Sequence, residues 1–210
     1  MSKESVRVFI RMRANEPAEE IDEQDFALVD ETAVEFGREK KKLSFDYVLS
    51  SACEQTAMYA KVGQDVIKQF MNGFNGTIFA YGQSGSGKTY TMLGPEDVVE
   101  ELKKTVTDVP QKVQALYGII PRAVDDIFSL IAAEKAKNAN SVFEMQAYYL
   151  EIYMEQLNDL LTEERNLKMR LRQNGSIQIL NCAGRPVAKK EDIYEILREG
   201  QLRRAVAETG

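Results

Sequence analysis

The sequence predicts an α/β fold with a mixed central β-sheet flanked by helices. Short runs rich in β-branched and aromatic residues alternate with amphipathic helical runs along the 210 residues. A glycine-rich turn at residues 82–89 lies between an apolar run and the expected start of a helix, as in a strand–loop–helix unit. With 44% apolar and 29% charged residues, the chain has the composition of a globular domain with a sizeable core.

The first half of the chain is expected to hold short strands and one long helix. Alternation of apolar and polar residues, or an unbroken apolar run, predicts strands at 6–12, within 26–36, at 43–48 and at 77–81. The last of these is apolar throughout, which is typical of a strand buried on both faces. Residues 51–54 match a capping box, which predicts a helix from there to about Met71.

The second half is expected to begin with an insertion. Residues 94–117 are acidic and contain Pro95 and Pro110, so we interpret them as interrupting the helix that follows the glycine-rich turn. A helix then restarts at Gly118 and is expected to run through Ile131, with Pro121 in its first turn, where a missing N–H costs nothing. The remaining elements are expected in this order: a strand at 141–153, a short helical piece at 157–161, a hairpin of 167–172 with 176–180, and a helix at 189–206.

The glycine-rich turn carries a phosphate-binding motif. Its residues match G-x-x-x-x-G-K-[ST], the P-loop, and are Gly82, Gln83, Ser84, Gly85, Ser86, Gly87, Lys88 and Thr89. The glycines allow a tight turn that points backbone N–H groups at an anion, and Lys88 adds a charge for the outer phosphates. The Thr89 hydroxyl is a ligand of the kind that Mg²⁺ prefers. The motif therefore predicts a site for a nucleotide and Mg²⁺, with Lys88 and Thr89 as the residues closest to the chemistry.

Composition excludes several other classes of function. The chain has no histidine, which excludes histidine acid–base catalysis and histidine-ligated zinc. A net charge of −6 argues against a nucleic-acid partner, and no run is long enough to cross a membrane. The two cysteines, Cys53 and Cys182, form no metal-binding spacing, which fits a reducing intracellular compartment.

Residues 73–92 resemble the kinesin motor domain. That family has the pattern G-[YF]-N-G-T-[IV]-F-A-Y-G-Q-[ST]-x-[SA]-G-K-T-x-T-M, and this sequence reads GFNGTIFAYGQSGSGKTYTM. Further segments resemble the family in the same order, namely 44–48, 118–122, 149–153 with 159–161, and 204–209. The resemblance covers essentially the whole chain. It implies that residues 1–210 form the N-terminal portion of a single kinesin-like motor domain of the P-loop NTPase type, with 94–117 as an insertion within the P-loop helix.

The resemblance also implies further nucleotide contacts and the cofactors. Arg11, Arg13 and Ala14 align with the family's R-x-R-P segment, so Arg11 and Tyr90 are expected to flank the adenine, with Arg13 nearby. Ala14 stands where the family has proline, which removes an apolar plane beneath the base. ATP or ADP with Mg²⁺ are the cofactors that the family implies.

The family's second partner is the microtubule, whose surface is acidic. The basic residues Lys168, Arg170 and Arg172 alternate with apolar ones and are the best local candidates for that contact. The alternative interpretation is a strand face that is merely solvated. The resemblance implies a location on the microtubule cytoskeleton in the cytoplasm, with no nucleic-acid or membrane partner and with an oligomeric state set by other regions.

Two family segments, N-x-x-S-S-R-S-H and D-x-A-G-x-E, do not occur in these 210 residues. We therefore expect this chain to bind nucleotide but to hydrolyse it poorly, and the complete motor to be a microtubule-stimulated ATPase that produces movement. Two alternatives stay open at this point. One is a non-motile kinesin-like module that binds nucleotide or tubulin without cycling. The other is an unrelated P-loop kinase or GTPase, which predicts an N-K-x-D motif or an arginine-rich lid, and neither is found.

Overall fold

The structure is a computed structural model that describes residues 6–13, 26–95, 98 and 111–204. The chain forms two compact units, and each is described by itself. The first unit comprises residues 1–95 with 115–123, and the second comprises 96–114 with 124–210. Helix α6 (Ile119–Lys137) begins in the first unit and continues into the second.

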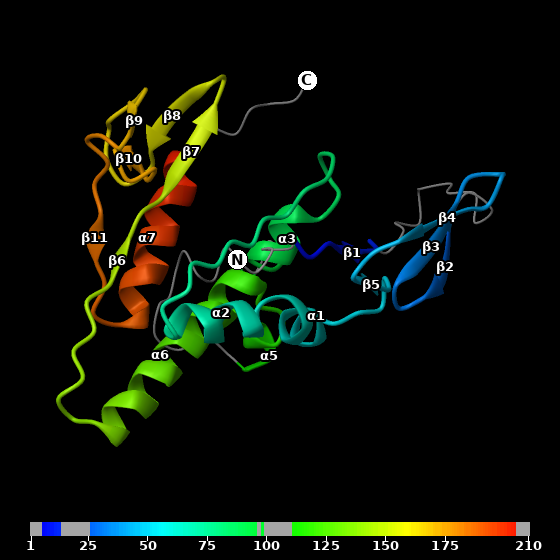
Figure 1. The fold of residues 1–210 in the computed structure, drawn as a ribbon, viewed down its shortest axis with the longest axis horizontal. Helices are drawn as coiled ribbons and strands as arrows, with labels where there is room; N and C mark the ends of the chain where they lie inside the picture. The colour runs from blue at the N-terminus through cyan, green and yellow to red at the C-terminus, as the bar shows by residue number, and fades with distance from the viewer. Residues whose placement is uncertain (1–5, 14–25, 96–97, 99–110, 205–210) are drawn as a thin grey trace. The chain divides into compact units, whose positions relative to one another are not determined.

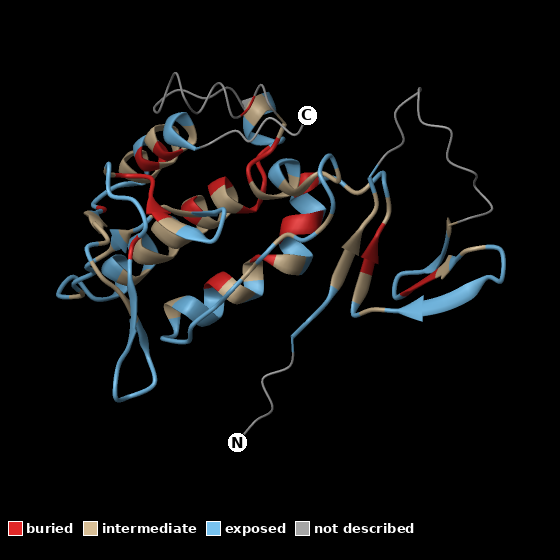
Figure 2. Ribbon diagram, turned by 90° about the horizontal axis from the view of Figure 1, so that it is seen from above, coloured by how far each residue is buried: buried red, intermediate tan, exposed pale blue. Residues whose placement is uncertain are grey.

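The first unit combines small sheets with short helices (Figure 1). Its strands are β1 (Phe9–Arg11), β2 (Phe26–Asp30), β3 (Ala33–Phe36), β4 (Lys41–Ser44) and β5 (Tyr47–Leu49). Its helices are α1 (Gln55–Val62), α2 (Gln64–Met71), α3 (Lys88–Met92) and the start of α6. Strands β1 and β5 pair in parallel, whereas β2, β3 and β4 form an antiparallel meander in which only the start of β3 is buried (Figure 2).

The core of the first unit lies between β5, α1 and the start of α6. Its buried members are Leu49, Met58, Tyr59 and Ile119. Met92, at the end of α3, packs against this cluster, so the short helix that follows the P-loop is anchored on the core.

The helix expected at 51–71 is divided at Gly63 into α1 and α2. A Cβ on Gly63 would lie 2.5 Å from the Tyr59 ring, so glycine lets that ring lie against the backbone. The predicted capping box is wrong. Helix α1 begins at Gln55, after Glu54, with no side-chain cap, because the Cys53 N–H closes a turn onto the Ser50 carbonyl at 3.0 Å.

The buried strand expected at 77–81 is also wrong. The segment belongs to no sheet formed by the described residues, and the Phe79 and Tyr81 side chains are 72% and 95% exposed. Only Ile78 packs against the core of the first unit. A strand has two buried faces only when it pairs within a sheet that other elements cover on both sides, and neither the pairing nor the covering is encoded in the run itself.

The second unit contains α5 (Gln111–Gln114), most of α6, and α7 (Lys190–Arg203). Its strands are β6 (Gln146–Ala147), β7 (Leu150–Tyr153), β8 (Gln156–Asp159), β9 (Met169–Leu171), β10 (Ile177–Ile179) and β11 (Arg185–Pro186). They pair antiparallel as β6 with β11, β7 with β8, and β9 with β10. Leu161, Val187 and Ile196 form its buried core, against which Phe128 of α6 packs.

Several predictions for the second unit are confirmed and others are corrected. The hairpin around Asn174-Gly175 forms with Leu171 opposite Ile177, as its turn residues indicate. The helical piece expected at 157–161 is wrong, because residues 156–159 pair with β7 as a strand. The single strand expected at 141–153 is divided into β6 and β7, and α6 continues to Lys137 rather than ending near residue 131. Most of the 94–117 insertion lies outside the described residues, as do residues 205 and 206 at the end of the last predicted helix.

Candidate nucleotide-binding site

The P-loop turns from the extended segment 77–81 into α3. Gly87 precedes the helix with a backbone φ of 94°, which residues other than glycine rarely adopt. A Cβ added to Gly87 would meet no heavy atom within 4 Å, so the loop is open on that side. Gly85 also has a left-handed φ, of 77°. Glycine is therefore required here by backbone conformation, and the turn leaves room beside it for a ligand.

The Lys88 side chain folds back over its own loop. Its ammonium group donates hydrogen bonds to the carbonyl oxygens of Gly82, at 2.9 Å, and Gln83, at 2.8 Å. The eight residues of the loop include no carboxylate. Within the described residues this cation is held by neutral carbonyl oxygens, and a phosphate oxygen offers it a stronger bond because that oxygen carries negative charge. The donors present in the loop therefore fit a phosphate chain.

Thr89 lies in the first turn of α3 and is exposed. Its hydroxyl is a hard oxygen ligand of the kind that Mg²⁺ takes together with phosphate oxygens. The helix itself is only five residues long, Lys88–Met92. Most of the electrostatic effect of a helix N-terminus comes from the unpaired N–H groups of its first turn, so even this short helix offers donors to an anion in the loop.

Arg11 and Tyr90 come together beside the loop. The Arg11 guanidinium carbon lies 4.9 Å from the centre of the Tyr90 ring, which is a cation–π contact. Partial burial lowers the pKa of Arg11. The two side chains stack on each other, so they do not bracket a gap that a planar base could enter. A base could stack only on an outer face of this pair.

Arg13 reaches the P-loop itself. Its Nη1 donates to the carbonyl oxygen of Gly85 at 2.8 Å. The structure thus brings Arg11, Arg13, Tyr90 and residues 82–89 together within the first unit. Ala14, the position where the related family has proline, lies outside the described residues.

Gln55 was not indicated by any pattern in the sequence. Its side chain is only 2% exposed, and it hydrogen-bonds both Arg11 and the backbone of Tyr90. A polar residue at the start of a helix is ordinary in sequence, so only the packed structure identifies it.

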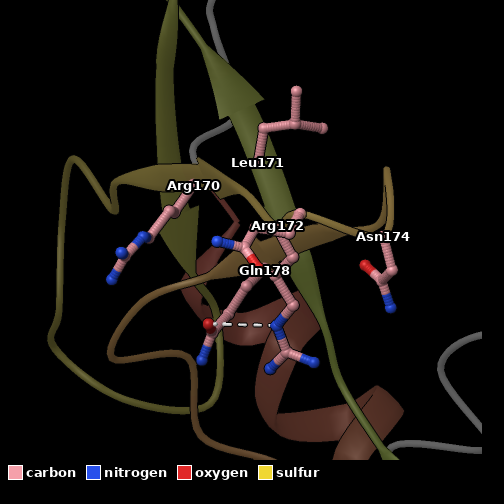
Figure 3. A pocket seen from close by; sticks show the side chains of 6 residues that line it. Arg170, Leu171, Arg172, Asn174 and Gln178 are labelled. Atoms are coloured by element: carbon pink, nitrogen blue, oxygen red, sulfur yellow. Dashed lines mark hydrogen bonds between the residues drawn. The ribbon is translucent and has the colours of Figure 1, made fainter.

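The basic residues Lys168, Arg170 and Arg172 lie in the second unit, along β9 and its ends. All three are exposed. Figure 3 shows Arg170 and Arg172 beside Gln178 in a shallow hollow, with the Arg172 Nε donating to the Gln178 Oε1 at 3.2 Å. The opposite face of the hairpin is apolar and also exposed, with Met169 at 67% and Leu171 at 72%.

The described part of the chain offers neither a metal-binding cluster nor a helix that could span a membrane. No group of three or more His, Cys, Asp or Glu side chains there could hold a metal ion. No helix in these ranges combines the length and the apolar character needed to cross a bilayer.

Comparison with known proteins identifies the family. The sequence model of the kinesin motor domain family matches residues 6–210. Kinesin-related protein 3 of Dictyostelium discoideum is 35% identical over 86% of this chain, and Kinesin-like protein KIF15 of Rattus norvegicus is 34% identical over 98% of it. The chain spans only 14% and 15% of the lengths of those two relatives.

A solved structure also matches this chain. It is described as "Structure of a fast kinesin: Implications for ATPase mechanism and interactions with microtubules". It matches with a TM-score of 0.77 and 27% identity, over 98% of this chain and 55% of that one. This match confirms the predicted α/β fold of the P-loop NTPase type and leaves no support for an unrelated kinase or GTPase. Residues 6–210 therefore belong to the kinesin motor domain family.

Proposed function

We propose that this chain binds ATP or ADP with Mg²⁺ at residues 82–89, as the nucleotide-binding portion of a microtubule motor. The observation that carries the proposal is the Lys88 ammonium group, which lies within hydrogen-bonding distance of two P-loop carbonyls. In the proposed complex it exchanges them for β- and γ-phosphate oxygens. Thr89 provides the protein's hydroxyl ligand for Mg²⁺, and the stacked pair of Arg11 and Tyr90 contacts the base, with Arg13 bracing the loop at Gly85.

In this proposal, the bound metal–nucleotide supplies the phosphoryl group, and the residues of the chain hold it in position. Phosphoryl transfer depends on positioning and on stabilisation of charge rather than on covalent chemistry by the protein. Lys88 is the cation placed to neutralise charge on the outer phosphates. We infer that the complete motor is a microtubule-stimulated ATPase that drives movement along microtubules in the cytoplasm. Because the two kinesin segments named above are not among the 210 residues, we expect these residues alone to turn over slowly.

Titration of a fluorescent ADP tests the nucleotide site. In Mg²⁺ buffer, Lys88→Ala should weaken binding at least tenfold, because it removes a charge-assisted bond to phosphate. Thr89→Ala should weaken binding in Mg²⁺ and have little effect in EDTA. Equal affinity of wild type and Lys88→Ala would refute the proposed site.

We also propose that Lys168, Arg170 and Arg172 contact the acidic surface of the microtubule. The support for this contact is local charge: three exposed cations lie on β9 and directly beside its two ends, in a chain of net negative charge. An acidic protein needs such a basic face to approach an acidic partner, and the contribution of that face should fall with salt.

Cosedimentation with microtubules tests this contact. A triple alanine variant of the three residues should pellet less than wild type at low salt, and the two should converge as salt is raised. The matched control replaces Lys40, Lys41 and Lys42 in the β3–β4 turn region, which removes the same charge from another exposed hairpin. Equal loss of binding in both variants would show that only net charge matters and would refute a specific contact.

A further inference from the structure

The strongest unexplained feature of the first unit is the buried amide of Gln55. Its Oε1 accepts a hydrogen bond from the Arg11 Nη1 at 2.9 Å, and its Nε2 donates to the Tyr90 carbonyl at 2.7 Å. Arg11 can only donate, so the orientation of the amide is fixed by its partners. With 2% of its surface exposed, Gln55 has both ends of its amide hydrogen-bonded inside the protein.

The partners of Gln55 come from two other segments. Arg11 ends β1, and Tyr90 lies in α3, the helix that follows the P-loop. Gln55 is the first residue of α1, which packs on the core of the unit through Met58. The amide therefore ties the arginine and the P-loop helix to one rigid element.

Arg11 depends on this arrangement. Besides the bond to Gln55, its guanidinium donates to the Thr91 hydroxyl at 3.0 Å and lies 3.5 Å from the Cys53 carbonyl. These contacts are with neutral oxygens, and they hold the planar group over the Tyr90 ring. Long arginine side chains lose much rotamer freedom when held in this way, so removing one neutral partner weakens the stacked geometry.

We propose that Gln55 is a positioning residue for base recognition: it fixes Arg11 on Tyr90 so that the pair forms one composite platform for a purine base. This inference rests on the proposed nucleotide site. A guanidinium held over an aromatic ring adds positive charge to the pair and leaves an outer face free for a base, which suits the electron-rich face of a purine. Gln55 touches neither the P-loop carbonyls nor Lys88, so it governs affinity for the base and not for the phosphates.

The test compares a nucleotide with its phosphate chain alone. Calorimetric titrations measure binding of Mg·ATP and of Mg·tripolyphosphate to wild type, Gln55→Ala and Gln55→Glu. Gln55→Ala should lower ATP affinity about tenfold and leave tripolyphosphate affinity unchanged. Gln55→Glu keeps an acceptor for Arg11 and loses the donor to Tyr90, so its ATP affinity should lie between the other two.

Met58→Ala is the matched control, because it removes a buried apolar side chain from the same helix. It should lower stability without changing the ratio of ATP to tripolyphosphate affinity. If Gln55→Ala behaves like this control, or binds ATP as tightly as wild type, the inference is overturned. If Gln55→Ala does not fold, Gln55→Glu decides: ATP affinity equal to that of wild type overturns the inference. If wild type itself binds neither ligand, the proposed nucleotide site fails instead.

Discussion

Gly118 packs directly against the end of the P-loop helix, and replacing it by alanine should destabilise the first unit. A Cβ at this position would lie 2.5 Å from the Met92 carbonyl carbon and 2.6 Å from the Leu93 nitrogen. These distances are 0.9 and 0.8 Å shorter than the 3.4 Å at which ordinary contact begins. Both obstacles are backbone atoms, so they cannot move aside by changing a rotamer.

These contacts set the loss in the free energy of unfolding expected for Gly118→Ala. The Gly118 N–H donates to the Leu93 carbonyl at 3.0 Å, so relieving the overlap stretches or breaks this hydrogen bond. Overpacking typically costs about 1–3 kcal/mol and a lost hydrogen bond about 1 kcal/mol. We expect Gly118→Ala to lose about 2–3 kcal/mol, which lowers Tm by about 4–12 °C for a chain of this length.

Thermal unfolding followed by circular dichroism measures this loss, and Gly184→Ala is its control. A Cβ on Gly184 would lie 2.6 Å from Tyr148, a similar overlap, but Tyr148 is a side chain with 54% exposure that can swing away. Gly184→Ala should therefore lower Tm by less than about 3 °C. If Gly118→Ala melts at the same temperature as wild type, or if both variants lose the same amount of Tm, overlap with the backbone does not set the cost at Gly118.

Three further substitutions give distinct expectations. Asp159 is 1% exposed and its carboxylate accepts two backbone N–H groups, so Asp159→Ala should cost about 2–4 kcal/mol in urea unfolding; an unchanged midpoint would contradict this. Paired hydrogen bonds from Arg185 lower the pKa of Glu199, so this carboxylate stabilises the fold above its unfolded pKa and loses that effect as pH falls through its folded pKa. Wild type should therefore lose more stability than Glu199→Gln as the pH falls from about 5. Parallel curves of Tm against pH for the two proteins would contradict this expectation. Among the described residues, the Lys42 side chain makes one exposed ion pair, to Asp30 at 3.9 Å, so Lys42→Ala should change stability by less than about 0.5 kcal/mol, and a larger loss on urea unfolding would be inconsistent with that weak pair.

Features that depend on a few neighbouring residues could be predicted from the sequence. Asn174-Gly175 between two alternating runs is enough to define a hairpin, and β9 and β10 pair as expected. Pro121 likewise marks the first turn of α6, which begins at Ile119. The P-loop motif is also a local feature that the sequence reveals, because its glycines, Lys88 and Thr89 lie within eight residues.

Features that depend on residues far apart in the sequence could not be predicted from it. The run 157–161 is short and apolar, which suits a helix or a strand, and pairing with β7 decides in favour of a strand. The turn joining these strands places Met154 and Glu155 at φ of 47° and 60°, values that their residue types do not favour. The contact of Gln55 with Arg11 spans 44 positions, so no local pattern could reveal it.

If residues 82–89 hold the nucleotide, binding must protect their backbone amides, and hydrogen exchange measures that protection. Exchange is measured by mass spectrometry on the 210-residue chain with and without saturating Mg·ADP. Exchange should slow in peptides that cover residues 82–92, where phosphate contacts and the ordered helix start protect the amides. Exchange should not change in β9 and β10, because that hairpin is proposed to contact the microtubule. Unchanged exchange at 82–92, or protection confined to the hairpin, would show that the nucleotide is not held at residues 82–89.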